Sequence, residues 1–405
     1  MNIQPSHPHR LDQKEPHILI LVVMSSFASM GAVIFSPALP EIARYFDISE
    51  GHSQLTITLF LLGYAVGQLI YGPLANRYGR KPAFYTGIAI STVGSLISIG
   101  SEPLHSFTAL IIGRMLEALG SSAGLAISFT IIGDYYYPAQ ARRIVAYLML
   151  AFAIVPGIAT LVGGVLVTNF HWVSCFYFLL IYGLVLIYPA MHLEETAQVL
   201  QPDALHLNRL IHNYGTALRN RLLITTTFFF GLSGVCVYIY IASSPFIAIN
   251  YLKQSPQYYG LIGLIPYLGT ASGSMVSARL TSLFSATALM RMGLFIIFFA
   301  AIFLGLLFYL GVINLTILIV CGFILMFGNC LIVGSGASIA TAKLEDKANA
   351  SAIMNFVNVG MVMLGTFVLS VVPGSPMVKL PVMFLLTVVL MSILWLWLVD
   401  KSNQH

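Results

Sequence analysis

The sequence predicts an all-α membrane protein with twelve transmembrane helices, arranged as two pseudo-symmetric halves of six. Three observations lead to this class. Of the 405 residues, 58% are hydrophobic and only 8% are charged, whereas soluble domains carry about 25% charged residues. Twelve apolar runs are long enough to cross the hydrocarbon core of a bilayer, which is roughly 30 Å thick. A polar stretch, 192–220, separates the first six runs from the last six.

The predicted spans are joined by short connections. They cover residues 18–39, 53–73, 82–100, 107–133, 144–168, 172–191, 222–249, 257–279, 288–310, 313–336, 351–372 and 381–399. The first run is longer than the apolar core of a signal peptide, so we interpret it as an uncleaved span. The chain then divides into an N-terminal half (1–191), a linker (192–220) and a C-terminal half (221–405).

The placement of lysine and arginine predicts the orientation, because cytoplasmic loops of membrane proteins are enriched in both. With the N-terminus in the cytoplasm, fifteen of the 19 basic residues fall in cytoplasmic segments and three fall in outer loops. The remaining one, Arg114, lies within a span. We therefore expect both termini and the linker to be cytoplasmic. As a separate expectation, the membrane is the inner (plasma) membrane of a bacterium.

Several other classes of function are not expected. The net charge of +5 does not indicate nucleic-acid binding, because the basic residues are scattered in short loops. Cys321 and Cys330 would lie about 13 Å apart along one helix, which is too far for a disulfide. All ten histidines fall in termini or connecting loops and form no zinc motif. We expect no metal, no cofactor and no enzymatic site, since no nucleophile–base arrangement is visible.

One pair of ionisable residues lies well inside a predicted span. Arg114 and Glu117 are three residues apart in the run 107–133, which places both side chains on one helical face. Ionisable groups at membrane depth are costly and usually face a bundle interior or a water-filled path. The other thirteen acidic residues fall in termini, loops or the ends of spans. Glu117 is therefore the candidate proton carrier, with Arg114 as its partner.

Two alternatives for this pair stay open. Burial disfavours a charged Glu117 and the neighbouring Arg114 favours it, so a change in water access or in their contact would switch its charge. In the first alternative, the pair is a fixed structural ion pair, since buried pairs are not necessarily functional. In the second, Arg114 binds an anionic substrate and Glu117 only orients it.

The connection after the second span carries the run Gly72-Pro73-Leu74-Ala75-Asn76-Arg77-Tyr78-Gly79-Arg80-Lys81-Pro82. Its spacing resembles the loop signature G-x-L-a-D-r-x-G-r-[RK] of the major facilitator superfamily. The resemblance implies the twelve-helix fold of that family and a gating loop made of Gly72, Asn76, Arg77, Gly79, Arg80 and Lys81. Asn76 stands where the family has an aspartate. We expect Asp134, at the cytoplasmic end of the fourth span, to pair with Arg77 or Arg80 instead and to act as the latch acid.

Other runs support the same resemblance. Arg114-Met115-Leu116-Glu117-Ala118 is similar to the family motif R-x-x-Q-G, and Leu193-Glu194-Glu195-Thr196 resembles its P-E-T sequence. Phe35-Ser36-Pro37-Ala38-Leu39-Pro40 resembles D-x-x-x-P-A-L-P of bicyclomycin-resistance-type exporters, with Val33 at the aspartate position. The antiporter motif G-P-x-x-G-G is half kept in the fifth span, where we expect Pro156, Gly157, Gly163 and Gly164 to permit bending.

The resemblance to drug:proton antiporters implies proton-coupled export of amphipathic small molecules by alternating access, performed by a monomer. The alternative is a carrier for a specific polar or carboxylate-bearing metabolite, such as a siderophore, with Arg114 as anion anchor. The substrate cavity is expected at the bilayer midplane between the halves. Aromatic, methionine and asparagine side chains suit its wall, and our candidates are Met149, Phe152, Phe230, Tyr238, Tyr267, Asn329, Asn355 and Asn358.

Overall fold

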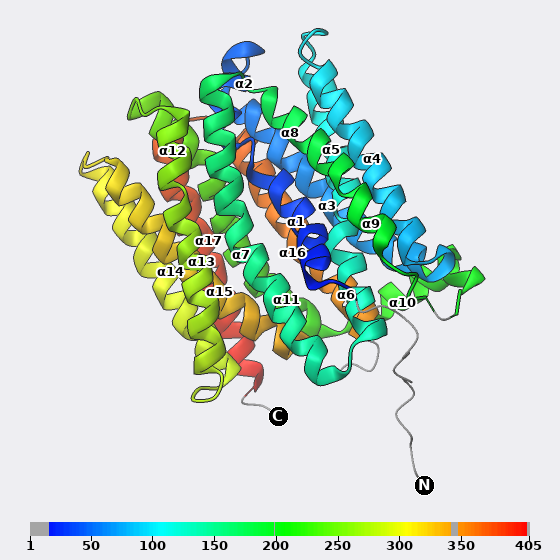
Figure 1. Ribbon diagram of the computed structural model, residues 1–405. Helices are drawn as coiled ribbons and strands as arrows, with labels where there is room; N and C mark the ends of the chain where they lie inside the picture. The colour runs from blue at the N-terminus through cyan, green and yellow to red at the C-terminus, as the bar shows by residue number, and fades with distance from the viewer. Residues whose placement is uncertain (1–15, 198, 342–346, 403–405) are drawn as a thin grey trace.

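A computed structural model describes residues 16–197, 199–341 and 347–402 (Figure 1). Within these ranges, twelve helical segments are long and apolar enough to cross a membrane. The predicted class and the number of spans are therefore confirmed. The basic residues Arg10, Lys14 and Lys343, which contribute to the predicted orientation, lie outside the described residues.

The N-terminal half consists of six spans, several of which are built from two consecutive helical segments. Its elements are α1 (Ile18–Val33), η1 (Ser36–Ala38), α2 (Leu39–Tyr45), α3 (Glu50–Tyr78), α4 (Arg80–Gly100), α5 (Phe107–Ser121), α6 (Ala123–Tyr135), α7 (Pro138–Asn169), α8 (Ser174–Val185) and α9 (Ile187–His192). The fourth span thus combines α5 and α6, and the sixth combines α8 and α9. Breaks of this kind are tolerated because neighbouring helices satisfy the freed backbone groups.

A short helical connection precedes the six spans of the C-terminal half. The connection contains η2 (Pro202–Leu205) and α10 (Leu207–Arg219). The second half contains α11 (Arg221–Pro245), a π-helical segment η3 (Phe246–Tyr251), α12 (Pro256–Ile262), α13 (Leu264–Leu280), α14 (Ala286–Tyr309), α15 (Leu315–Thr341), α16 (Lys347–Val371) and α17 (Pro376–Ser402). Polar caps begin several of these helices, as where Asn220 Oδ1 accepts a hydrogen bond from the Leu223 amide at 2.9 Å.

The two halves pack side by side along the bundle axis. Helix α3 packs against α16, and α7 packs against α12 and α13. Figure 1 shows α2 at one end of the bundle, and α10 and the end of α17 at the other. We refer to these as the α2 end and the α10 end. The largest cluster of buried apolar side chains includes residues of both halves, so the interface between the halves belongs to the core.

Direct hydrogen bonds join the halves toward the α2 end. Ser36 Oγ donates to the carbonyl oxygen of Ile241 at 3.3 Å, and Gln54 Nε2 donates to that of Ala242 at 3.1 Å. A third bond runs from Asn250 Nδ2 to Glu50 Oε1 at 2.9 Å. We refer to these three contacts as the α2-end seal. In an apolar environment each of them gives a partner to a group that would be costly to leave unpaired.

Candidate functional site

The buried ion pair lies on α5, in the first half of the fourth span. Arg114 Nη1 donates to Glu117 Oε2 at 3.0 Å, as the spacing of three residues on one helix predicts. Arg114 Nη2 also donates to the carbonyl oxygen of Gly31 on α1, at 2.8 Å. Arg114 is 0% exposed and Glu117 is 1% exposed. The pair therefore ties α5 to α1 inside the N-terminal half.

Three phenylalanine rings surround the guanidinium group of Arg114. Its Cζ atom lies 3.9 Å from the ring centroid of Phe35, 4.3 Å from that of Phe60 and 5.8 Å from that of Phe176. A desolvated cation gains about 2 kcal/mol from such a contact. The rings come from the first, second and sixth spans and partly replace the hydration that burial removes. They help to hold a charged arginine inside an apolar bundle.

Two polar atoms of the pair are left without a hydrogen-bond partner within the described part of the chain. They are Arg114 Nε and Glu117 Oε1. A buried polar atom without a partner costs free energy, and each such exception calls for an explanation. A proton on Oε1 would remove the negative charge of the carboxylate, and water reaching Oε1 would supply the missing donor. Oε1 is therefore the atom where a proton or a water molecule would be accommodated best.

A cavity of about 180 Å³ lies between the two halves. Its wall includes residues of α1, α3 and α7 from one half, and of α11, α13 and α15 from the other. The wall is largely aromatic and aliphatic, with hydroxyl groups such as those of Tyr64 and Thr270 and the amide of Asn329. None of the lining residues carries a charge. The cavity therefore suits a ligand that is largely apolar and makes a few hydrogen bonds.

The structure brings only part of the predicted substrate-binding set to this cavity. Four of the eight residues line it, namely Phe152, Tyr238, Tyr267 and Asn329. The other four, Met149, Phe230, Asn355 and Asn358, are not among its lining residues. Met149 is exposed, Phe230 is buried beside Gly336, and Asn358 lies beside Gly231. Pro156, which we expected to permit bending, also lines the cavity.

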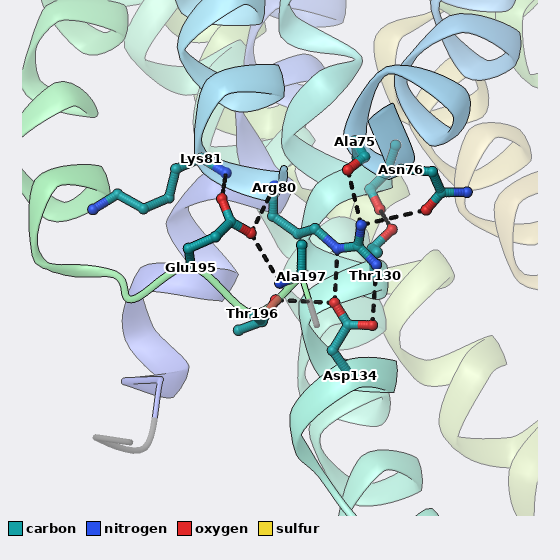
Figure 2. Close-up of polar contacts among 10 residues, drawn as sticks. Ala75, Asn76, Arg80, Lys81, Thr130, Asp134, Glu195, Thr196 and Ala197 are labelled. Atoms are coloured by element: carbon teal, nitrogen blue, oxygen red, sulfur yellow. Dashed lines mark hydrogen bonds and ion pairs between the residues drawn. The ribbon is translucent and has the colours of Figure 1, made fainter. Parts of the chain in front are cut away.

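Asp134 binds Arg80 in the connection between α3 and α4 (Figure 2). Arg80 Nε donates to Asp134 Oδ2 at 2.8 Å, and Nη2 donates to Oδ1 at 3.2 Å. Arg80 Nη1 donates to the carbonyl oxygen of Ala75 at 2.8 Å and to Asn76 Oδ1 at 3.3 Å. Of the two arginines that we expected as partners, Arg77 instead lies over the ring of Tyr78.

Glu195 also joins this network, which the sequence did not lead us to expect. Its carboxylate accepts the backbone N–H groups of Arg80 at 2.9 Å and Lys81 at 3.0 Å. Thr196 Oγ1 donates to Asp134 Oδ2 at 2.9 Å. Figure 2 shows Glu195 and Thr196 beside Arg80 and Lys81 at the start of α4. An acidic group at a helix N-terminus is favourable because it binds free N–H groups. The resemblance of 193–196 to P-E-T was the one available signal.

Gly79 is the turn that makes this contact possible. Its φ angle is +102°, a region that residues with a side chain rarely adopt. A Cβ atom at this position would lie 2.6 Å from Glu195 Oε2. Two physical reasons therefore favour glycine at position 79: its backbone conformation and the close approach of Glu195. Gly72 at the other end of the motif is different, since nothing lies within 4 Å of its Cβ position.

The glycines of α7 lie where this helix meets its neighbours. Gly163 touches the backbone of Ile34 on the first span. Gly157 faces Tyr267, and a Cβ atom on Gly164 would lie 2.5 Å from the carbonyl oxygen of Pro256. Small residues let helices in a membrane approach closely, so all three serve as packing residues in this conformation. Helix α7 is assigned as one helix over its whole length, and the bending that we expected at these positions stays a prediction.

Taken together, the fold and site define an integral membrane protein with an uncharged cavity between two helical halves and a buried ion pair beside that cavity. A sequence profile of the Major Facilitator Superfamily matches residues 21–366. The chain belongs to this superfamily of transporters, as its loop motif and its span count predict.

Curated relatives and solved structures agree with this assignment. The chain is 32% identical over 164 residues to multidrug resistance protein D of Escherichia coli, which is 40% of this chain and 41% of that protein. It is 24% identical over 293 residues to a bicyclomycin resistance protein homolog of Haemophilus influenzae, covering 71% and 72% of the two chains. The xylose transporter XylE from E. coli, in a partially occluded inward open conformation, has the same fold, with a TM-score of 0.71 at 11% identity over 92% of this chain and 96% of that one.

Proposed function

We propose that the protein exports amphipathic, largely uncharged small molecules from the cytoplasm in exchange for protons. The observation that carries this proposal is the cavity between the halves, whose described lining is aromatic and aliphatic and holds no charged residue. Aromatic and methionine side chains adapt to ligands of different shape. Similarity to proteins named for multidrug and bicyclomycin resistance supports a drug as the exported compound.

The second part of the proposal concerns Glu117, which would carry the proton. Among the described residues it is a buried acidic residue well inside a span, and its Oε1 has no hydrogen-bond partner there. Protonation would neutralise Glu117 and remove the counter-charge of Arg114. The guanidinium would then be stabilised by its hydrogen bond to the Gly31 carbonyl and by the phenylalanine rings. One charge moving through the membrane potential provides about 2.3 kcal/mol per 100 mV. This energy would drive the export of a neutral compound.

Alternating access would expose the cavity to each side in turn. The α2-end seal supports an outward side that is closed in the present conformation, because Ser36, Gln54 and Glu50 of one half bond to the other half there. The excess of basic residues in the remaining loops supports a cytoplasmic α10 end. In this orientation both termini, the linker and the Arg80–Asp134 network face the cytoplasm of a bacterium. Release to the outside would require the seal to open.

The alternative function, a carrier for a carboxylate-bearing metabolite, receives less support. It needs Arg114 to bind the anion, but Arg114 is 0% exposed and is not a lining residue of the cavity. Its guanidinium donates to Glu117 and Gly31 and packs against aromatic rings. An anion would have to displace these partners and enter an uncharged cavity. A neutral or weakly charged substrate requires neither change.

The test uses a bacterial strain that lacks its own drug exporters. Expression of the protein should lower the cellular accumulation of neutral aromatic antibiotics, and a protonophore should restore it. Tyr238→Ala and Tyr267→Ala, which alter the cavity wall, should weaken the effect for some compounds and not others. Met149→Ala, an exposed position outside the cavity, serves as the control. Unchanged drug accumulation together with protein-dependent growth on one carboxylate nutrient would contradict export.

A further inference from the structure

Phe60 occupies the boundary between the cavity and the buried ion pair. It lies on α3, lines the cavity and is only 2% exposed. On its other side, its ring centroid is 4.3 Å from Arg114 Cζ. Neither Arg114 nor Glu117 lines the cavity itself. The ring is therefore in direct contact with both the cavity and the ion pair.

The edge of the same ring also lies beside the unpartnered oxygen of Glu117. A Cβ atom built on Gly31 would be 3.3 Å from Phe60 Cε2 and 3.3 Å from Glu117 Oε1. The ring edge and the carboxylate oxygen thus flank the same small space at the Gly31 backbone. The residue after Gly31 on α1, Ala32, already lines the cavity. The Phe60 ring and the α1 backbone at Gly31 and Ala32 therefore lie next to both the cavity and the space beside Oε1.

We propose that Phe60 is a shutter between the substrate cavity and Glu117. In the conformation described here its ring covers Oε1, and a substrate that enters the cavity displaces the ring and opens the path for a proton. The inference rests on the proposed function, because it takes Glu117 as the proton carrier. Phe60 is a positioning residue in this mechanism, since it neither binds nor releases the proton. It ties proton access to the presence of substrate and so limits futile proton leak.

The positive charge on Arg114 favours the closed position of the Phe60 ring. The guanidinium attracts the face of the Phe60 ring, so the ring returns to its place once the cavity is empty. Phe35 and Phe176 contact the same guanidinium, yet neither is a lining residue of the cavity. Among these three rings, Phe60 is the one that a substrate can touch. This contact distinguishes it from residues that only pack around Arg114.

The first test measures the accessibility of Glu117 without any transport assay. Purified full-length protein is treated with a hydrophobic carbodiimide in the absence of substrate, and modification of Glu117 is followed by mass spectrometry. Phe60→Ala should react at least about tenfold faster than the wild type, as expected when a gate is removed. Phe152→Ala removes another ring from the cavity wall that has no contact with the pair, and it should react at the wild-type rate. Equal rates for Phe60→Ala and the wild type would overturn the proposal.

Phe60→Leu covers the case in which the alanine variant does not fold. Leucine keeps much of the volume but loses the ring face, so we expect an intermediate rate of modification. The same comparison with Phe152→Leu controls for changes in packing. A Phe60→Leu rate no higher than that of Phe152→Leu would also overturn the proposal.

The second test measures proton leak in proteoliposomes without substrate. Phe60→Ala should leak protons, and the double variant Phe60→Ala/Glu117→Gln should not, because the leak passes through Glu117. A leak that persists in the double variant would show that protons cross by a path that does not use Glu117, and it would overturn the proposed role of Phe60. Failure of wild-type protein to move protons when substrate is added would contradict the proposed function instead. In that case faster modification of Glu117 in Phe60→Ala would still establish the shielding.

Discussion

Arg80 and Asp134 form a two-bond ion pair that joins the α3–α4 connection to the end of α6, with Nε–Oδ2 and Nη2–Oδ1 distances of 2.8 and 3.2 Å. Asp134 thereby provides a carboxylate next to Asn76, where the superfamily signature has its own aspartate. Glu195 accepts the backbone N–H groups of Arg80 and Lys81 at the start of α4. All these residues precede α10 in the chain. The network therefore connects elements of the N-terminal half with the beginning of the linker.

Neutralising Asp134 should loosen this connection. Asp134→Asn keeps the shape but loses the charge-assisted bonds to Arg80, which are worth about 1.5–3 kcal/mol each. We expect faster amide hydrogen exchange in the segment 76–81 and a slower transport cycle. Arg77→Gln is the matched control, because Arg77 contacts the ring of Tyr78 rather than Asp134. Transport and conformer populations that are unchanged in Asp134→Asn would contradict the latch role of this residue.

Two glycines of the loop motif should respond to alanine in opposite ways. Gly79→Ala forces a side chain into a backbone conformation with φ of +102° and brings its Cβ to 2.6 Å from Glu195 Oε2, so it should destabilise the protein by about 1–3 kcal/mol. Gly72 lies within α3 with nothing near its Cβ position. Gly72→Ala should therefore raise the free energy of unfolding by up to about 1 kcal/mol. Thermal unfolding in detergent measures both. Equal shifts of Tm in the two variants would refute the difference.

Removing Arg114 alone should be more harmful than removing both members of the pair. Arg114→Met leaves a buried Glu117 without its counter-charge, a change that typically costs about 3–5 kcal/mol. Arg114→Met/Glu117→Gln removes the charge as well and should recover part of the lost stability. Thermal or denaturant unfolding of the purified proteins provides the comparison. A double variant that is less stable than Arg114→Met would argue against a charged Glu117 in this conformation.

A Cβ atom on Gly164 should weaken closure at the α2 end. Gly164 of α7 faces the carbonyl oxygen of Pro256 on α12 at a distance that leaves no room for a side chain. Gly164→Ala should therefore shift the population toward conformers open at this end. Spin labels at Asn169 and Lys253, in a background without the native cysteines, should report longer distances. Gly360→Ala, where nothing lies within 4 Å, should leave the distances unchanged.

The spans and the buried pair could be predicted from the sequence because both depend on local properties. Long apolar runs follow from the thickness of the bilayer, and the contact between Arg114 and Glu117 follows from helical spacing. Asp134 was expected to bind one of two nearby arginines, and the structure selects Arg80. Each of these inferences uses residues that are close in sequence or lie at the same end of adjacent spans.

The cavity wall could not be predicted to the same degree, because it depends on which face each helix turns inward. Lipid is as apolar as the bundle core, so hydrophobic patterning does not separate the two faces of a membrane helix. Phe152 and Met149 lie on the same helix, yet only Phe152 lines the cavity. The packing of Phe60 on Arg114 joins two spans that are distant in sequence, and no motif indicated it.

The most direct test of the central claim measures proton movement in proteoliposomes that contain a pH-sensitive dye. Uncharged aromatic compounds and, separately, a polycarboxylate are added to wild-type protein and to Glu117→Gln. We predict that an uncharged compound triggers proton flux in the wild type and that Glu117→Gln, although inserted and folded, shows none. Substrate flux without proton movement, or undiminished proton movement in Glu117→Gln, would contradict the account and leave Arg114 and Glu117 as a structural ion pair.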